Sequence, residues 1–442
     1  MSDQFGFSSI AIQIPQILLP AKQIDLSKWA VVACDQYTSQ PDYWARVKET
    51  TDNQPSSLNV IFPEVYLEDN DGEQRIININ QTMADYLNDG TLSPLAQPSF
   101  VLVDRKTSQV PSRKGLVVSI DLEAYDFTKG SSSLIRATEG TIVDRLPPRI
   151  KVRKDADIEM PHIMVLIDDP DKTVIEPLFN EALETLYDFE LMEKSGHIKG
   201  LLVDQDKHLQ QVADALKALA APSTFADKYD AKGHDVLLYA MGDGNHSLAT
   251  AKAIWEQLKE EADDKEAILS SPSRYALVEL VNIHDEGLIF EPIHRVLFDI
   301  DSDNFLDFCQ QPIERFSSKD AMLGAIKNIG ETTDHIIPFN DAKGYGYINI
   351  ENPKFTLELA SFEDLLSQYQ QQHPDVKVDF IHGDDVVDEL GVKEGNMGLF
   401  FPPISKHSLF KTIIFDGALP RKTFSMGEAD EKRFYMEARK IK

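Results

Sequence analysis

One segment, Leu237–Trp255, constrains the fold of this chain more than any other. Its first residues are apolar and predict a buried strand, two glycines then bracket Asp243, and an amphipathic helix follows. A helix N-terminus presents free backbone N–H groups and the positive end of the helix dipole, which favour a bound anion. The sequence therefore predicts an anion site in this loop. The candidates for catalysis are Asp243 and His246, and the candidates for anion binding are Gly244, Asn245 and Ser247.

A simpler interpretation of the same loop is a capped helix. Asn245 or Ser247 would then be the capping residue, and the glycines would serve only the turn. However, Asp, Asn, His and Ser occur together here, which is more polar chemistry than one cap needs. We therefore favour a functional site.

The composition limits the classes of protein to consider. A chain of 442 residues exceeds the size at which one core stops growing, so two or three lobes are expected. The formal net charge of −29 argues against nucleic acid and anionic membranes as partners and leaves a small-molecule substrate. The oligomeric state stays open.

The predicted location is the cytoplasm. With only two cysteines, Cys34 and Cys309, no disulfide framework is expected, which favours a reducing compartment. The first residues lack the basic region of a secretory signal, and no apolar run approaches membrane-spanning length.

Alternating strand and helix patterns predict an α/β or α+β fold with mixed sheets and flanking helices. The predicted strands are Ile10–Ile14, Trp29–Ala33, Asn59–Phe62, Phe100–Asp104, Gly115–Leu122, His162–Ile167 and Tyr275–Ile283. The predicted helices are Pro41–Thr50, Thr82–Asn88, Ile175–Leu186, Lys207–Ala220, Ser318–Ile329, Phe362–Gln372 and a charged helix from Glu428 onward. The predicted lobes are a strand-rich lobe 1–130, an α/β core 131–300, and an α+β lobe 301–442 whose tail returns to the site.

Two basic clusters stand out in so acidic a chain. Five cations fall within residues 145–154, beginning at Arg145, shortly after Arg136 and Glu139. Arginine and lysine supply charge-assisted donors to phosphate or carboxylate, although surface ion pairs explain this first cluster equally well. The second cluster favours function, because it combines cations with hydroxyls. Its members are Arg421, Lys422, Thr423 and Ser425, with Lys432 and Arg433 further on.

Three histidines lie where sites assemble in α/β folds. His246, His294 and His382 each fall at the end of a predicted strand or in a loop, beside charged residues. They are candidate acid–base groups or metal ligands. Zinc is not favoured, because no Cys pair and no His-Glu-x-x-His helix exists, and no residue is assigned as a metal ligand. Magnesium held by carboxylates and substrate phosphates stays open.

These motifs together resemble a bacterial family called domain of unknown function 1015. The resemblance covers most of the chain in consistent order. The motifs that carry it are Asp243–His246, Ile135–Thr141 with Asp144–Arg145, Glu291–Arg295, Ile381–His382 and Leu419–Thr423. That family usually has Asp-Gly-His-His-Arg in the loop, whereas this chain has Asn245 and Ser247 at the third and fifth positions. The chain therefore looks like a divergent branch.

The loop is also similar to that of the ParB and sulfiredoxin superfamily, where related loops at a helix N-terminus bind nucleotide phosphates. One branch comprises kinases that phosphorylate free serine. The resemblance implies a ParB/sulfiredoxin-like element and a bound nucleotide or phosphorylated metabolite near Gly242–Ser247. A sulfiredoxin-like activity would need a cysteine in this loop, and a ParB-like clamp would need basic DNA-binding modules, and the chain has neither.

The leading hypothesis is a kinase-like phosphotransferase that acts on a small hydroxylated metabolite such as serine, with ATP or ADP and Mg²⁺ as candidate cofactors. Such a reaction needs donors around the phosphate and a group that orients the hydroxyl. Candidates for the second role are Asp243, Glu139, His246 and His294. Candidates for ligand binding outside the loop are Arg136, Arg145, Arg295, His382, Arg421, Lys422, Thr423 and Ser425. The alternatives are a non-catalytic sensor of a nucleotide or phosphometabolite, and a phosphate-ester hydrolase.

Overall fold

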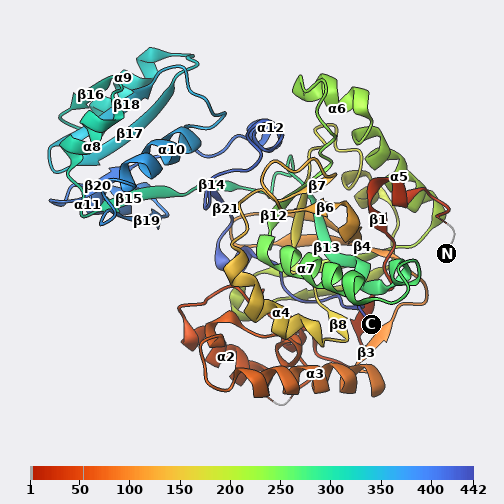
Figure 1. The fold of residues 1–442 in the computed structure, drawn as a ribbon. Coiled ribbons are helices and arrows are strands. Elements are labelled where there is room, and N and C mark those ends of the chain that lie inside the picture. Colours follow the sequence, from red (N-terminus) through yellow and green to blue (C-terminus); the bar gives the residue numbers. More distant parts are fainter. Residues whose placement is uncertain (1–2, 53) are drawn as a thin grey trace. The chain divides into compact units, whose positions relative to one another are not determined.

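The computed structural model describes residues 3–52 and 54–442, apart from the side chain of residue 407, and confirms the predicted α/β class with mixed sheets (Figure 1). The chain forms two compact units. Unit 1 consists of Met1–Ile289 together with Gly427–Lys442, and unit 2 consists of Phe290–Met426. The last residues of the chain, 427–442, are called the C-terminal segment below.

Unit 1 is built around one mixed sheet. Its strands are, in spatial order, β10 (Thr185–Glu190), β11 (His197–Val203), β4 (Phe100–Lys106), β5 (Arg113–Asp121), β13 (Tyr275–Asn282), β9 (Met164–Ile167), β12 (Tyr239–Asp243), β7 (Ile135–Arg136) and β6 (Tyr125–Asp126), with β1 (Ile12–Gln13) paired to β5. The pairs β13–β9, β12–β7 and β6–β7 are parallel, and the others are antiparallel. Both predicted lobes 1–130 and 131–300 contribute strands to this sheet.

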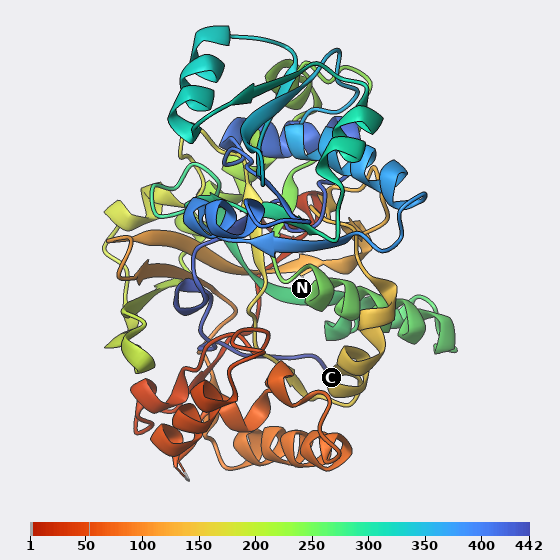
Figure 2. The ribbon, with the colours of Figure 1, turned by 90° about the vertical axis from the view of Figure 1, so that its left-hand side faces the viewer.

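Both faces of the unit 1 sheet are covered, which explains its uninterrupted apolar strands. Leu116 packs into one core with Trp255 of helix α7 (Asn245–Glu261) and with helix α5 (Asp206–Leu219), whereas its neighbour Val117 packs into the opposite core. That second core contains Trp44 of α2 (Pro41–Thr51), Met83 of α3 (Gly72–Asn88) and apolar residues of the C-terminal segment. Figures 1 and 2 both show α2 and α3 gathered at one end of unit 1.

The remaining elements of unit 1 are helices and short strand pairs. The helices are α1 (Leu26–Trp29), α2 (Pro41–Thr51), α3 (Gly72–Asn88), α4 (Leu146–Lys154), α5 (Asp206–Leu219), α6 (Pro222–Tyr229) and α7 (Asn245–Glu261). The short pairs are β2 (Leu18–Pro20) with β3 (Leu92–Pro94) and β8 (Ile158–Glu159) with β22 (Arg439–Lys440). Short 3-10 turns lie at Phe7–Ile10, Ser57–Val60, Glu64–Tyr66, Leu122–Ala124, Val143–Arg145, Glu176–Asn180, Met192–Lys194, Ala267–Ser270, Pro272–Arg274 and Ala429–Glu431.

Unit 2 is an antiparallel sheet with helices. The strand order is β16 (Ile313–Phe316), β18 (Gly344–Ile350), β17 (His335–Asp341), β20 (Met397–Leu399), β15 (His294–Phe298) and β19 (Lys377–Ile381). The helices are α8 (Ser302–Cys309), α9 (Lys319–Ile329), α10 (Glu358–Gln370), α11 (Asp384–Gly391) and α12 (Lys406–Asp416). A separate pair joins β14 (Phe290–Pro292) to β21 (Phe424–Met426), so the first and last residues of unit 2 lie side by side.

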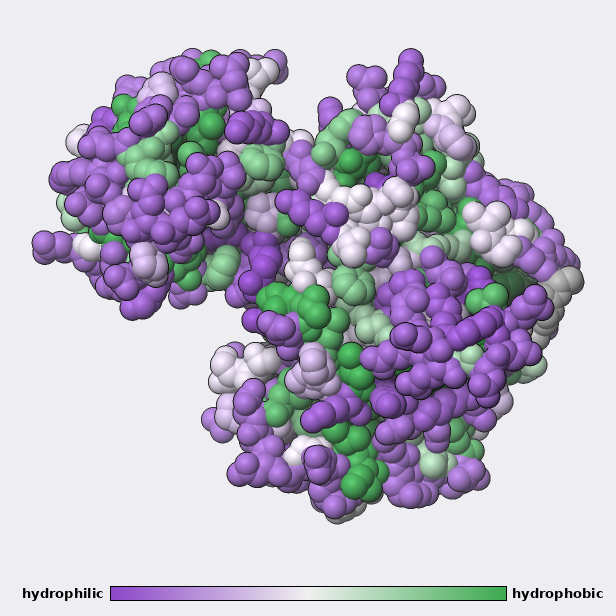
Figure 3. All heavy atoms as spheres, viewed as in Figure 1, coloured by the Kyte–Doolittle hydropathy of each residue, from purple (hydrophilic) through white to green (hydrophobic). Residues whose placement is uncertain are grey.

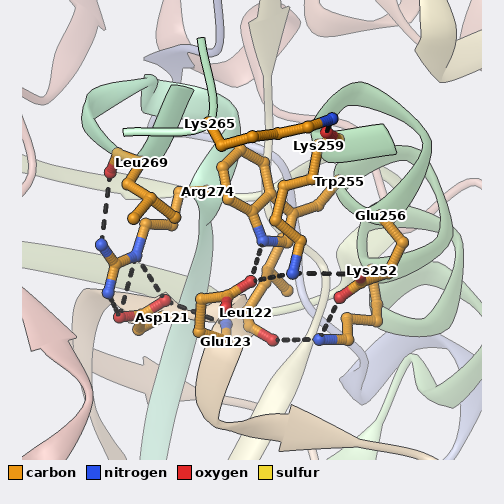
Figure 4. Close-up of polar contacts among 10 residues, drawn as sticks. All are labelled: Asp121, Leu122, Glu123, Lys252, Trp255, Glu256, Lys259, Lys265, Leu269 and Arg274. Carbon is orange, nitrogen blue, oxygen red and sulfur yellow. Dashed lines mark hydrogen bonds and ion pairs between the residues drawn. The ribbon is translucent and has the colours of Figure 1, made fainter. Parts of the chain in front are cut away.

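Polar contacts fix helix α7 on the sheet (Figure 4). Glu123 accepts hydrogen bonds from the indole of Trp255 and from Lys259, and Lys252 donates to the carbonyl of Leu122 at 2.9 Å. Trp255 is fully buried, so its N–H needs this partner. The helix that begins with the Asn245 loop is therefore held firmly over the end of β5.

A buried ion cluster holds the C-terminal segment inside unit 1. Arg433 bonds to both Glu279 of β13 and Glu437, and the side chains of all three are no more than 1% exposed. Its Nε also donates to the carbonyl of Pro161 at 3.1 Å, and Tyr187 donates to Glu437. Nearby carboxylates outweigh the effect of burial and raise the pKa of Arg433, so the guanidinium stays charged.

Several sequence predictions of secondary structure are wrong. Trp29–Ala33 is the end of α1 followed by a single bridge, and Asn59–Phe62 begins in a 3-10 turn. Ile175–Leu186 divides into a 3-10 turn and the start of β10, because it contains Pro177 and its strand pairs with β11. The charged helix expected from Glu428 onward is a single 3-10 turn, Ala429–Glu431, followed by non-helical chain, because its residues are buried by the second core and the ion cluster.

Among the described residues, no helix is long and apolar enough to cross a membrane. Hydrophilic residues cover most of the face of unit 1 seen in Figure 3, and hydrophobic residues form separate groups between them.

The substitution Arg433→Met tests the ion cluster. It leaves Glu279 and Glu437 buried without their cation, so we expect the free energy of unfolding to fall by about 3 to 5 kcal/mol in chemical denaturation. The matched control is Arg46→Met, which breaks a 3.1 Å pair between Glu193 and a 55% exposed arginine and should cost less than about 1 kcal/mol. Equal losses in the two variants would contradict the anchoring role.

Candidate functional site

The loop after β12 has the strand–loop–helix geometry expected from the sequence. Gly244 connects β12 to α7 with φ of 81°, and a Cβ atom there would lie 3.1 Å from Cα of Ile163. Glycine is therefore required both by the left-handed backbone and by the close approach of the chain before β9. The capping interpretation of Asn245 and Ser247 is wrong, because both lie inside the helix and no side chain caps it.

Asp243 is held by the loop and by the C-terminal segment. Its Oδ1 accepts from the N–H of Gly244 at 2.8 Å, and its Oδ2 lies 3.2 Å from Nζ of Lys432. Burial alone would raise the pKa of Asp243, but the charge and hydrogen bond of Lys432 outweigh it and lower the pKa. The carboxylate is therefore ionised, with a cation beside it at the helix N-terminus.

Asn245 joins the loop to the segment after β7. Its Nδ2 donates to Oγ1 of Thr138 at 3.3 Å, whereas its buried Oδ1 has no hydrogen-bond partner within the described residues. Glu139, the next residue after Thr138, is half-buried, as is His246. The two predicted motifs 135–141 and 243–246 therefore meet in space.

A chain of hydrogen bonds runs from the first turn of α7 to the C-terminal segment. Ser247 Oγ lies 2.8 Å from Nε2 of His162, and Nδ1 of the same ring lies 2.8 Å from the hydroxyl of Tyr435. The backbone N–H of Cys34 donates to that hydroxyl at 3.1 Å. A serine, a histidine and a tyrosine from three distant parts of the sequence are thus aligned.

These residues line a cavity of about 150 Å³ within unit 1. Most of its wall is apolar, with side chains from the 3-10 turn before Glu64, from α3, α4 and the segment before β9. Examples are Val60, Phe62, Met83, Val152, Ile158 and Met160. His162, Ser247 and Tyr435 form the polar side of the cavity, next to the loop.

The charged groups on the cavity wall are paired. Arg149 bonds to Glu64 at 2.5 Å, and Arg153 bonds to Glu159 at 2.6 Å. Burial raises the pKa of Glu64 despite Arg149. For Glu159 the balance is reversed, because Arg439 and Arg153 outweigh burial and lower its pKa. The cation cluster predicted at 145–154 therefore supplies wall residues, and Arg145 itself is exposed.

Arg136 is occupied by the fold. It is 5% exposed. Its Nε donates to the carbonyl of Ser133 at 2.8 Å, and its Nη2 donates to the carbonyl of Asp235 at 2.8 Å. It ties β7 to the chain before β12.

The other candidate residues lie in unit 2. His294 is buried, its Nδ1 accepts from the N–H of Phe401 at 3.1 Å, and its Nε2 donates to Asp384 at 3.0 Å. The ring is therefore neutral in this arrangement, and burial lowers its pKa although Asp384 acts in the opposite direction. Arg295 is fully buried and bonds to Glu363 at 2.8 Å.

The tail motif of unit 2 is held through its backbone. Arg295 donates to the carbonyls of Arg421 at 2.8 Å and Lys422 at 3.1 Å, while both of those side chains are exposed. Thr423 is buried and donates to the carbonyl of Pro420 at 2.6 Å. Ser425 is half-buried in β21, and His382 is exposed after β19. The ligand-binding roles of these residues stay predictions.

Unit 1 thus brings together Asp243, Gly244, Asn245, His246, Ser247 and the Thr138–Glu139 segment. Sequence reasoning noted Lys432 as a cation but assigned it no role, and it missed His162 and Tyr435. The signal for His162 was a histidine directly before a buried strand, whereas nothing local marked Tyr435. Among the described residues, no group of three or more His, Cys, Asp or Glu side chains is placed to hold a metal ion.

A comparison with protein families covers three of the five motifs, those before residue 374. Residues 18–374 match the family described as protein of unknown function DUF1015. The chain belongs to the DUF1015 family. This confirms the resemblance drawn from the motifs. A comparison with curated proteins finds no match.

Solved structures give distant similarities. A variant of free serine kinase in complex with ADP is 9% identical, with a TM-score of 0.38, and the alignment covers 74% of this chain and 92% of that one. A conserved hypothetical protein from Pyrococcus furiosus is 12% identical, with a TM-score of 0.35 and coverages of 74% and 95%. A C-terminally truncated SbnI from Staphylococcus aureus is 9% identical, with a TM-score of 0.36 and coverages of 70% and 82%.

The ion pair of Asp243 predicts a pH dependence of stability. Its pKa in the folded protein lies below the ordinary value of 3.8, so the pair stabilises the fold above that value and ceases to do so as the pH falls through the folded pKa. We expect the difference in unfolding free energy between the wild type and Asp243→Asn to be constant above about pH 5 and to shrink as the pH falls below 3.8. The control is Asp227→Asn on the exposed face of α6. A difference that stays constant as the pH falls below 3.8 would contradict the pairing.

Proposed function

We propose that this chain binds a nucleotide or another phosphorylated metabolite at the N-terminus of α7 and transfers a phosphoryl group to a small hydroxylated metabolite. The observation that carries the proposal is the pairing of Asp243 with Lys432 beside a helix N-terminus that no side chain caps.

The electrostatics of the loop suit a phosphate. A helix of 17 residues begins at Asn245, so its dipole and first-turn N–H groups favour an anion. Lys432 is only 12% exposed and pairs with Asp243, so a phosphate at the helix N-terminus would share this cation with the carboxylate.

The same groups supply what phosphoryl transfer requires. The reaction depends mainly on positioning and on neutralising charge at the transferred group. Lys432 would neutralise the phosphate, and the ionised carboxylate of Asp243 would accept or orient the proton of the attacking hydroxyl. ATP or ADP is the proposed donor. Magnesium, which binds phosphates together with one or two carboxylates, would be held by the nucleotide and Asp243.

We place this activity in the cytoplasm. Both cysteines, Cys34 and Cys309, are free thiols, which suits a reducing compartment.

Lys432→Met tests the phosphate site. Loss of a hydrogen bond to a charged group should weaken the binding of ADP and ATP about tenfold or more. Binding is measured by calorimetry and by the ligand-dependent rise in melting temperature. Lys440→Met, an exposed lysine of the same C-terminal segment, is the matched control and should bind like the wild type. Equal affinities in the two variants, or no binding of any phosphorylated ligand by the wild type, would overturn the site.

Asp243→Asn separates an enzyme from a sensor. An asparagine keeps the shape but cannot accept a proton, so we expect turnover to fall about 10²- to 10⁴-fold while nucleotide affinity measured without Mg²⁺ is retained. Turnover is followed as nucleotide consumed in the presence of a panel of hydroxylated metabolites, with Asp227→Asn as control. Binding without turnover in the wild type would favour the sensor, and phosphate release without an acceptor would favour the hydrolase.

A further inference from the structure

The cavity beside the loop has no role in the phosphate site, yet it opens onto the same helix turn. Ser247 and Thr250 of α7 lie on its wall, and so do His162 and Ile163, the residue that a side chain at position 244 would strike. A molecule in this cavity would therefore lie next to a phosphate held at the start of α7.

The side chains that line the cavity determine whether a charged or an uncharged molecule can bind there. Each arginine on the wall, Arg149 and Arg153, already bonds to a carboxylate, Glu64 or Glu159. A charged ligand would have to lose its hydration without gaining an available counter-charge, which is costly in a mostly apolar cavity. The lining therefore favours an uncharged body and disfavours a zwitterion such as serine.

The volume of the cavity limits the size of the molecule that it can hold. A cavity of about 150 Å³ lined by apolar side chains is large enough for benzene in an engineered protein, so this one fits a single ring or a branched chain of similar size. Apart from the two ion pairs, His162, Ser247 and Tyr435 form a polar side of the wall. A hydroxyl is the group that both donates to and accepts from such a set.

The hydrogen-bond chain decides what happens to the hydroxyl. Burial, together with Cys34 beside it, raises the pKa of Tyr435, so the phenol keeps its proton. The phenol oxygen accepts from the N–H of Cys34, so its proton is donated to Nδ1 of His162, and Nε2 then donates to Oγ of Ser247. The serine hydroxyl is left to donate to the oxygen of a further hydroxyl, which holds that oxygen at the polar side of the cavity.

We infer that the cavity binds the acceptor of the proposed phosphoryl transfer, and that this acceptor is a small uncharged alcohol with an apolar, ring-sized body. The inference rests on the proposed function. The alcohol oxygen attacks phosphorus while the bond from phosphorus to the leaving oxygen of the nucleotide breaks, and the electron pair departs with that oxygen. The alcohol proton passes to the carboxylate of Asp243, which later releases it to solvent or product, while Ser247 and His162 hold the alcohol oxygen in place.

Binding to the cavity is measured first, without nucleotide. Benzyl alcohol is the probe, and we expect calorimetry and NMR of the full chain to show binding at least about tenfold tighter than that of benzylamine or serine, which carry charge. Ala156→Leu fills the cavity and should abolish binding, whereas Ala267→Leu, at an exposed position, should not. Ser247→Ala removes only the hydroxyl oxygen, so it should weaken the binding of benzyl alcohol but not the binding of toluene.

Absence of benzyl alcohol binding, or equal binding by Ala156→Leu and Ala267→Leu, overturns the assignment of the cavity. Tight binding of benzylamine or serine overturns the ligand class. If Ala156→Leu does not fold, Ser247→Ala still tests the assignment, because that substitution adds no atoms to the cavity.

Transfer is measured second, as phosphorylated benzyl alcohol formed from ATP or ADP and detected by mass spectrometry. His162→Gln should lower the rate, whereas His197→Gln, at the start of β11, should not. Bound alcohol and bound nucleotide without transfer would overturn the acceptor role. If no phosphorylated ligand binds, the proposed function itself is wrong. This outcome is distinct from a failure of the cavity assignment, because alcohol binding is measured separately, without nucleotide.

Discussion

The site depends on the buried ion cluster around Arg433. This residue sits between Glu279 of the central strand β13 and Glu437 of its own segment, and it is shielded from water on all sides. A buried charge without its partner is very unfavourable, so this pairing allows one position of the C-terminal segment against the sheet. Lys432 and Tyr435 lie within two residues of Arg433. Lys432 is thereby fixed at the loop, and Tyr435 at the cavity. The second half of the site is thus supplied from the far end of the chain.

The first half of the site depends on the placement of α7. Glu123 and the carbonyl of Leu122 hold the helix from beneath, through Trp255, Lys259 and Lys252 (Figure 4). At its start, Gly244 permits the backbone to turn against the chain preceding β9, so the first helical turn lies beside His162. Rigid support at both ends gives the short hydrogen bonds of the site a defined geometry.

Local patterns in the sequence revealed the loop but not its partners. The run from Leu237 to Trp255 contains its own strand, turn and helix signals, and therefore both elements could be predicted. Tyr435 and Lys432 lie in a segment whose charges resemble those of a surface helix, and only tertiary burial prevents an α-helix there. The same limit applies to Arg295 and Arg136. Both look like anion ligands in the sequence, yet their guanidinium groups bond to backbone carbonyls that no local pattern specifies.

The two substitutions that distinguish this loop from the usual family pattern have a common physical consequence. With arginine, as the family resemblance has it, position 247 would place a cation at the wall of the cavity. Serine there is neutral and bonds to His162, so the paired charges on that wall stay balanced. Asn245 likewise bonds to Thr138 without adding charge. Positive charge at the helix N-terminus then comes from Lys432, on the other side of Asp243. The loop therefore has the ion pair of Asp243 and Lys432 on one side and the neutral pair of Ser247 and His162 on the other, both beside the first turn of α7.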